Sequence, residues 1–140
     1  GAALCRMEIP AIDLSAIVVS GVEPEHLAKG PGHYPGTAAP GGPGNVCIAG
    51  HRVTFGHPFG RLDELETGDS IALEVSGLPY EYRVDEVYTV PREDNSPLRA
   101  TEGDVLTLTT CHPPHSSRER LIVRALRIPA DPVDEWLMGA

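Results

Sequence analysis

Residues 106–114 read LTLTTCHPP, and this stretch is the clearest indication of the fold. Side chains alternate between the two faces of a β-strand, so the two leucines share one face. The other face carries Thr107, Thr109 and Cys111. The pattern predicts a strand whose leucines enter a hydrophobic core and whose sulfur sits at the strand end on a more polar face.

The next apolar run, residues 121–128, follows closely enough to be the neighbouring strand. Residues 112–119 connect the two runs, which is long for a hairpin but sufficient for an antiparallel return. Cys111 ends the first strand and Arg120 directly precedes the second run. We therefore expect the thiol and the guanidinium to meet at the same rim of a sheet.

The rest of the chain repeats this pattern of short apolar runs separated by glycine and proline. The expected strands are residues 7–9, 17–20, 46–49, 70–75, 80–90, 105–110 and 121–128. Two short helical pieces are expected at residues 24–29 and 58–65, both too short for a crossover between parallel strands. An all-β fold, with an antiparallel sheet closed into a barrel, fits this pattern best.

Composition limits the classes of function. The chain has 140 residues, 41% of them hydrophobic, and we expect one globular domain over residues 1–140. A net charge of −9 argues against nucleic acid as a partner, because phosphates require a basic surface. No apolar run approaches the roughly 20 residues that cross a bilayer. Cys5 and Cys47 lie in apolar contexts and are expected to be buried free thiols, with a bridge between them as the alternative.

Cys111 and Arg120 together suggest chemistry on an acyl group. Such chemistry needs a thiolate, a proton donor for the leaving amine and a group that stabilises the oxyanion. Cys111 supplies the sulfur, and Arg120 supplies a permanent positive charge with several donors. The missing acid and base is a histidine. We prefer His51, which follows an apolar strand and a glycine, with His115 as the rival.

Residues 30–45, GPGHYPGTAAPGGPGN, form a long segment rich in glycine and proline. One interpretation is a flexible surface connection. The other is a wall beside a substrate groove, because long ordered loops in compact domains often carry function. The composition of this segment leaves both open.

Several of these stretches resemble the sortases. Residues 107–111, TLTTC, look like the TLxTC signature of that family, which an arginine at the start of the next strand follows. Residues 45–52, NVCIAGHR, resemble the strand and histidine of the same enzymes. Residues 51–59, HRVTFGHPF, are similar to actinobacterial class E sortases, and residues 30–37, GPGHYPGT, resemble their loop before the histidine. The resemblance runs from about residue 9 to residue 128; class E is preferred and class D is the alternative.

The resemblance implies a closed eight-stranded β-barrel with one or two short helices, and it implies roles for individual residues. Cys111 would be the nucleophile, His51 the general acid and base, and Arg120 the group that holds the substrate backbone and the oxyanion. Arg118 is the rival for the arginine. The substrate would also meet Thr110 and Tyr34.

The implied reaction is transpeptidation at an LPxTG-like or LAxTG-like C-terminal sorting signal of a surface protein. The surface protein is cleaved after the threonine, held on the enzyme as a thioester and passed to an amine of a peptidoglycan precursor. The resemblance implies no metal and no cofactor. It also implies a monomer of one domain, tethered by an N-terminal anchor that was removed before Gly1. The enzyme would lie at the outer face of the cytoplasmic membrane of a Gram-positive cell, beside the cell wall.

Two rivals remain at this stage. One is a metal-binding module without enzymatic activity, in which Cys111, His112, His115 and His51 would hold zinc. The absence of a CxxC pair argues against it. The other is a cysteine peptidase that passes its acyl group to water, which shares the acyl-enzyme step and so has the same sequence pattern.

Overall fold

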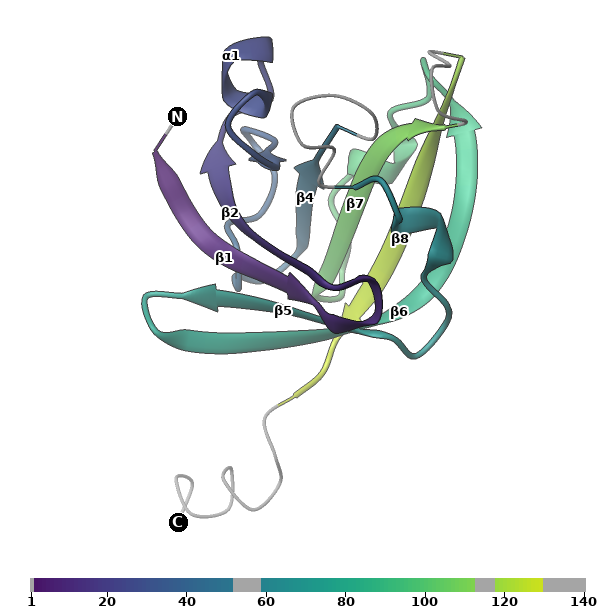
Figure 1. The fold of residues 1–140 in the computed structure, drawn as a ribbon. Coiled ribbons are helices and arrows are strands. Elements are labelled where there is room, and N and C mark those ends of the chain that lie inside the picture. The colour runs from purple at the N-terminus through teal and green to yellow at the C-terminus, as the bar shows by residue number, and fades with distance from the viewer. Residues whose placement is uncertain (1, 52–58, 113–117, 130–140) are drawn as a thin grey trace.

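The chain folds into a closed barrel of eight β-strands (Figure 1). The computed structural model describes residues 2–51, 59–112 and 118–129, and for residues 111 and 112 it describes the backbone alone. The strands are β1 (Ala3–Ile9), β2 (Leu14–Ser20), β3 (Gly32–His33), β4 (Asn45–Ala49), β5 (Ser70–Val75), β6 (Leu78–Pro91), β7 (Val105–His112) and β8 (Glu119–Arg127). The helices are α1 (Pro24–Leu27) and the 3₁₀ turns η1 (Pro10–Ile12), η2 (Leu62–Glu64) and η3 (Ser96–Leu98).

The strand order around the barrel is β1-β2-β3-β4-β7-β8-β6-β5, and β5 pairs with β1 to close it. The predicted all-β barrel is confirmed. The expectation of a purely antiparallel sheet is wrong, because β2 pairs with β3 and β4 pairs with β7 in parallel. Helix α1 lies in the connection between β2 and β3, so a single helical turn does serve a parallel crossover here.

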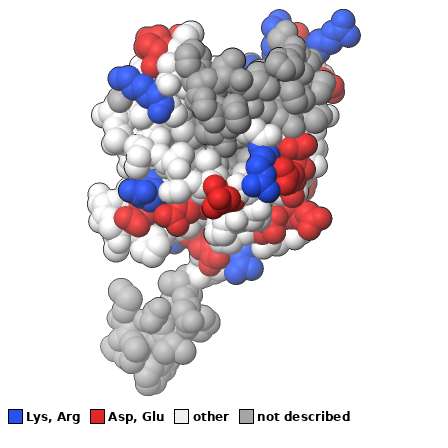
Figure 2. Space-filling model, viewed as in Figure 1, with Lys and Arg blue, Asp and Glu red and all other residues white. Residues whose placement is uncertain are grey.

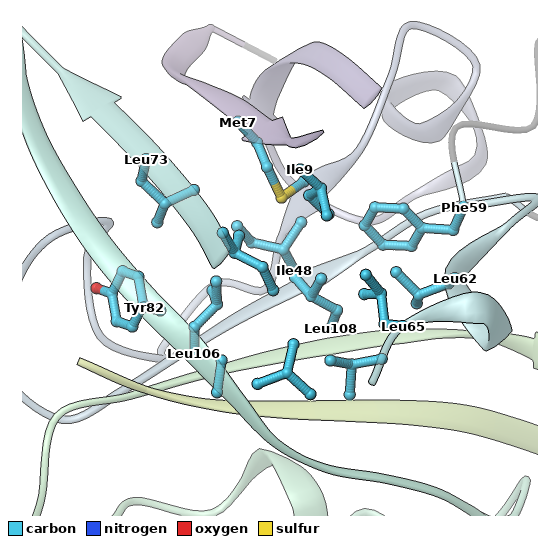
Figure 3. Packing of buried hydrophobic residues seen from close by; sticks show 14 of the residues in the cluster. Met7, Ile9, Ile48, Phe59, Leu62, Leu65, Leu73, Tyr82, Leu106 and Leu108 are labelled. Atoms are coloured by element: carbon cyan, nitrogen blue, oxygen red, sulfur yellow. The ribbon is translucent and has the colours of Figure 1, made fainter. Parts of the chain in front are cut away.

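The leucine face of β7 enters the core as predicted. Leu106 and Leu108 are fully buried, and Ile48 of β4 is buried among them (Figure 3). Full burial of an aliphatic side chain of this size contributes about 1.5–3 kcal/mol. Phe59, which precedes η2, and Leu62, which begins it, belong to the same core cluster. The predicted helix at 58–65 is therefore a short 3₁₀ turn whose apolar side chains fill the barrel.

The opposite face of β7 is polar but not exposed. Thr107 is fully buried and donates from its hydroxyl to the Asn45 Oδ1 atom at 2.7 Å. Asn45 in turn donates from Nδ2 to the carbonyl oxygens of Pro97 and Arg99, both at 2.9 Å. Thr109, which is 2% exposed, shares a hydrogen bond with the Tyr34 hydroxyl. Asn45 and Tyr34 thus provide hydrogen-bond partners for the threonines on this face, whose hydroxyls would otherwise be buried unpaired.

Cys5 and Cys47 are buried free thiols, as predicted, and they form no bridge. Burial raises the pKa of each thiol to about 11. Cys5 belongs to the core cluster. Cys47 lies on the other side of β4, next to Thr37, and its amide donates to the Thr37 hydroxyl at 3.3 Å.

The surface reflects the acidic composition. Acidic side chains gather over the lower part of the barrel, with scattered basic ones among them (Figure 2). In the ranges that the structure describes, no helix combines the length and the apolar character that a bilayer crossing requires.

Candidate active site

Cys111 and Arg120 are direct partners across the β7–β8 pair. Cα atoms of opposed residues in an antiparallel pair lie about 4.5–5.5 Å apart. The predicted meeting of these two residues at one rim is therefore confirmed for the backbone. The Cys111 side chain lies outside the described part of the chain.

The parallel β4–β7 pair brings His51 to the same rim. Ala49 pairs with Thr109, and the Gly50 amide continues the ladder by donating to the Thr109 carbonyl at 3.1 Å. Parallel strands advance together, so His51, two residues beyond Ala49, comes level with Cys111, two residues beyond Thr109. The upper ends of β4 and β7 in Figure 1 mark this rim.

Gly50 lets this strand end pack closely. A Cβ atom at this position would lie 2.6 Å from the Phe59 ring, closer than two carbons can approach. The amide of Phe59 also donates to the His51 carbonyl at 3.0 Å. The backbone just after β4 is thus fixed by Phe59, and the half-buried His51 follows it.

A cavity of about 180 Å³ opens at this rim. It brings together four of the five residues predicted for the site. Its lining consists of Leu27, Tyr34, Ala49, Gly50, His51, Thr109, Thr110 and Arg120. Residues from α1, from the segment after β3, from the end of β4, from β7 and from β8 therefore surround one space beside the backbone of Cys111.

The structure distinguishes the two candidate arginines by position. Arg120 lies within β8, is half-buried and lines the cavity. Arg118 is exposed and precedes β8 in a bend, where its carbonyl accepts from the Arg92 amide at 2.8 Å. Arg120 is therefore the candidate that the strand register holds beside Cys111.

Thr110 has a buried hydroxyl at the cavity wall. The residue is 4% exposed, and its Oγ1 atom makes no hydrogen bond within the described part of the chain. An unpaired polar atom of this kind costs about 1–3 kcal/mol, which a bound polar group can recover. The Thr110 Oγ1 atom is therefore the candidate for the predicted contact with the substrate.

Tyr34 lines the cavity from the glycine- and proline-rich segment. Its hydroxyl lies 3.1 Å from the Thr109 Oγ1 atom, and its amide donates to the Cys47 carbonyl at 2.9 Å. The segment is therefore hydrogen-bonded to β4 and forms a cavity wall. The geometry supports the wall interpretation over that of a flexible connection.

The other histidines differ in how much the structure describes of them. The His26 ring accepts from the Glu23 amide at 3.3 Å on α1, and the His33 ring contacts the Ala38 carbonyl at 2.7 Å. His115 and His57 lie outside the described residues, and His112 is described in its backbone alone. Within the described ranges, no group of three or more histidine, cysteine or acidic side chains is arranged to hold a metal ion.

Leu27, Ala49 and Thr109 also line the cavity, although none of them was predicted as a site residue. Leu27 reaches it because α1 crosses from β2 to β3 at the rim. Thr109 could have been found from the alternation along residues 106–111, because it shares the face of Cys111. Leu27 had no local signal of its own.

The structure defines a closed β-barrel in which His51 and Arg120 line a cavity at one rim, beside the backbone of Cys111. The family model described as a sortase domain matches residues 7–128. The chain belongs to the sortase family.

Curated relatives agree with this assignment. The chain is 35% identical over 108 residues to Sortase D of Bacillus subtilis (strain 168), covering 76% of this chain and 53% of that protein. It is 32% identical over 139 residues to Sortase SrtE1 of Streptomyces coelicolor, covering 88% of this chain and 40% of that protein. The chain therefore spans about half or less of the length of these relatives.

Solved structures show the same barrel. Sortase A from Corynebacterium diphtheriae, as a lid mutant, superposes with a TM-score of 0.85 at 32% identity, covering 94% of this chain and 73% of that one. Sortase C-1 from Actinomyces oris gives a TM-score of 0.86 at 30% identity, covering 92% of this chain and 75% of that one. These relatives carry the labels of several sortase classes, so the family is established at a level above class E.

Proposed function

We propose that this chain is the catalytic domain, over residues 1–140, of a sortase that transfers surface proteins to a cell-wall amine. The single observation that carries the proposal is the cavity that Arg120, His51 and Thr110 share beside the backbone of Cys111. Membership of the sortase family, whose members are cysteine transpeptidases, supplies the reaction type.

In the first half-reaction, the Cys111 thiol passes its proton to His51, and the resulting thiolate attacks the threonine carbonyl carbon of the sorting signal. Arg120 donates hydrogen bonds to the carbonyl oxygen as it gains negative charge. The bond between threonine and glycine then breaks, and the leaving amine takes a proton from His51. The product is a thioester on Cys111.

The second half-reaction regenerates the enzyme. An amine loses a proton to His51 and attacks the thioester carbonyl. The carbon–sulfur bond breaks, and the sulfur leaves as the thiolate, which takes the proton back from His51. A new amide joins the surface protein to the cell-wall precursor, and the chain returns to its starting state without a cofactor.

For the sorting signal we propose LAxTG, as in class E, with LPxTG of the other classes as the alternative. Similarity to SrtE1 and SrtE2 of Streptomyces coelicolor supports class E, and similarity to Sortase D supports class D. We place the enzyme, as a monomer, at the outer face of the cytoplasmic membrane of a Gram-positive cell, because this is where the reaction's partners lie.

A peptide assay tests the proposal. Fluorogenic LAxTG and LPxTG peptides are incubated with the protein, with and without a saturating amine, and the products are weighed by mass spectrometry. The proposal predicts cleavage between threonine and glycine, with the amine adduct as the main product. Dominant hydrolysis at saturating amine would instead indicate a peptidase, and no cleavage of either peptide would overturn the proposal.

A further inference from the structure

We propose that His33 and Thr37 are positioning residues that hold Tyr34 against the substrate cavity, and so set the affinity for the sorting signal. This inference rests on the proposed function for its consequence. Its structural basis is a closed hydrogen-bond network within residues 33–47, none of which except Tyr34 lines the cavity.

Tyr34 is held at three points. Its amide donates to the Cys47 carbonyl at 2.9 Å, and its hydroxyl shares a 3.1 Å hydrogen bond with the Thr109 Oγ1 atom. Its carbonyl accepts from the Thr37 hydroxyl at 2.8 Å and from the Thr37 amide at 3.3 Å. The ring is thereby placed at the wall of the cavity that His51 and Arg120 also line.

Thr37 links this turn to β4. Its single hydroxyl proton goes to the Tyr34 carbonyl, so its oxygen is left to accept hydrogen bonds. The Cys47 amide donates to that oxygen at 3.3 Å, and the His33 Nε2 atom lies 3.1 Å from it. One hydroxyl thus connects the strand, the ring of His33 and the backbone of Tyr34.

His33 closes the network from inside the turn. Its Nε2 atom lies 2.7 Å from the Ala38 carbonyl, which can only accept, so Nε2 carries a proton. The same N–H is oriented toward the Thr37 hydroxyl. The Ala38 amide donates to the Asn45 carbonyl at 3.0 Å, which fastens the far end of the turn to β4.

The arrangement accounts for the residue types. A histidine can reach across the turn to the carbonyl of the residue five positions further along the chain, and either its neutral Nε2–H form or its charged form makes the contact. The network therefore requires a donor at this position and not a charge. A glutamine places its amide nitrogen at nearly the same reach and is the conservative substitute.

The experiment compares His33→Ala with His33→Gln, and Thr37→Val with Thr37→Ser, using two readouts. The first is steady-state kinetics on the sorting-motif peptide. Losing one such hydrogen bond is expected to raise KM about fivefold to tenfold in His33→Ala and Thr37→Val, with kcat within about twofold of the original. His33→Gln and Thr37→Ser should restore KM to within about twofold of the original.

The second readout does not need turnover. Nitration of Tyr34 by tetranitromethane, located by peptide mass spectrometry, should become several-fold faster in His33→Ala and Thr37→Val and return to the original rate in the conservative variants. Nitration of the half-buried Tyr88 on β6 serves as the internal reference. A general loss of structure would raise both rates together.

The outcomes separate the two ideas. An unchanged KM, or an unchanged Tyr34 nitration rate, in both His33→Ala and Thr37→Val would overturn the positioning role. Conservative variants as impaired as the truncations would overturn it as well. If the original protein cleaves neither peptide, the proposed function fails, and the nitration comparison alone decides whether His33 and Thr37 hold Tyr34. If His33→Ala does not fold, the Thr37 pair gives the same comparison.

Discussion

Cys111 on β7 lies directly opposite Arg120 on β8 in the antiparallel register of the barrel. The register that pairs them also pairs Leu108 with Val123, two residues buried in the core. A slip by one residue would turn the buried face of either strand outward, so burial of the core fixes the pairing at the rim. The geometry of the site thus depends on the packing of the barrel.

The first prediction concerns the two arginines. Arg120→Ala should lower kcat/KM for the sorting-motif peptide by about 100-fold or more, because a donor to the developing oxyanion is lost. Arg118→Ala should change it by less than about threefold, because that side chain is exposed and lies outside the cavity lining. Both variants are assayed side by side; a larger loss in Arg118→Ala would contradict the assignment.

The second prediction concerns the general acid and base. His51→Ala should reduce kcat by about 10²–10⁴-fold, since no other group in the proposed mechanism carries the proton between the leaving and entering amines. His115→Ala should have a mild effect. The measurement is single-turnover cleavage with intact-mass detection. Comparable losses in both variants would leave the role of His51 without support.

The fold class could be read from the sequence because its signal is local. The alternation at residues 106–111 predicts which side chains enter the core, and the structure buries Leu106 and Leu108 there. The two-residue strand β3 could not be predicted, since Gly32 and His33 have no apolar pattern of their own. Its pairing with β2 and β4 depends on the assembled barrel.

The site was only partly visible in the sequence. Cys111 and Arg120 are joined by a short connection, so their meeting followed from the two strands on either side. The approach of His51 depends on the parallel pairing of β4 with β7, which no local pattern encodes. The family resemblance supplied that link. Leu27 enters the cavity through the crossover at α1 and needed the structure.

The third prediction concerns the buried hydrogen bonds that Asn45 makes beside the polar face of β7. Asn45→Ala removes the amide that binds the carbonyls of Pro97 and Arg99 and the Thr107 hydroxyl. Leaving such buried groups unpaired should lower the free energy of unfolding by about 2–4 kcal/mol. Urea denaturation of the variant measures the loss.

Asn95→Ala is the matched control for that measurement. Asn95 is exposed and makes no side-chain capping hydrogen bond at the start of η3. Its replacement should change the free energy of unfolding by less than about 0.5 kcal/mol. Equal effects in the two variants would contradict a special role for the buried amide of Asn45.

The fourth prediction concerns thiol reactivity. Burial raises the pKa of Cys5 and of Cys47 to about 11, so at pH 8 only about one in a thousand of either thiol is ionised. Iodoacetamide should therefore modify Cys111 first in the folded protein and all three cysteines in guanidinium chloride. Raising the pH from 8 toward 11 should accelerate labelling of the two buried thiols. Labelling of Cys47 as fast as Cys111 at pH 8 would contradict this, because it would show that the reagent reaches the Cys47 thiol readily in the folded protein.

The central claim is that the sulfur of Cys111 becomes acylated by the sorting signal, and trapping the enzyme with an LAxTG or LPxTG peptide tests it most directly. The reaction is quenched in acid, and intact mass and peptide mapping locate the adduct. The account predicts a mass increase equal to the peptide up to its threonine, located on Cys111, removed by hydroxylamine and absent in Cys111→Ala. An adduct on another residue, or undiminished cleavage by Cys111→Ala, would contradict the account.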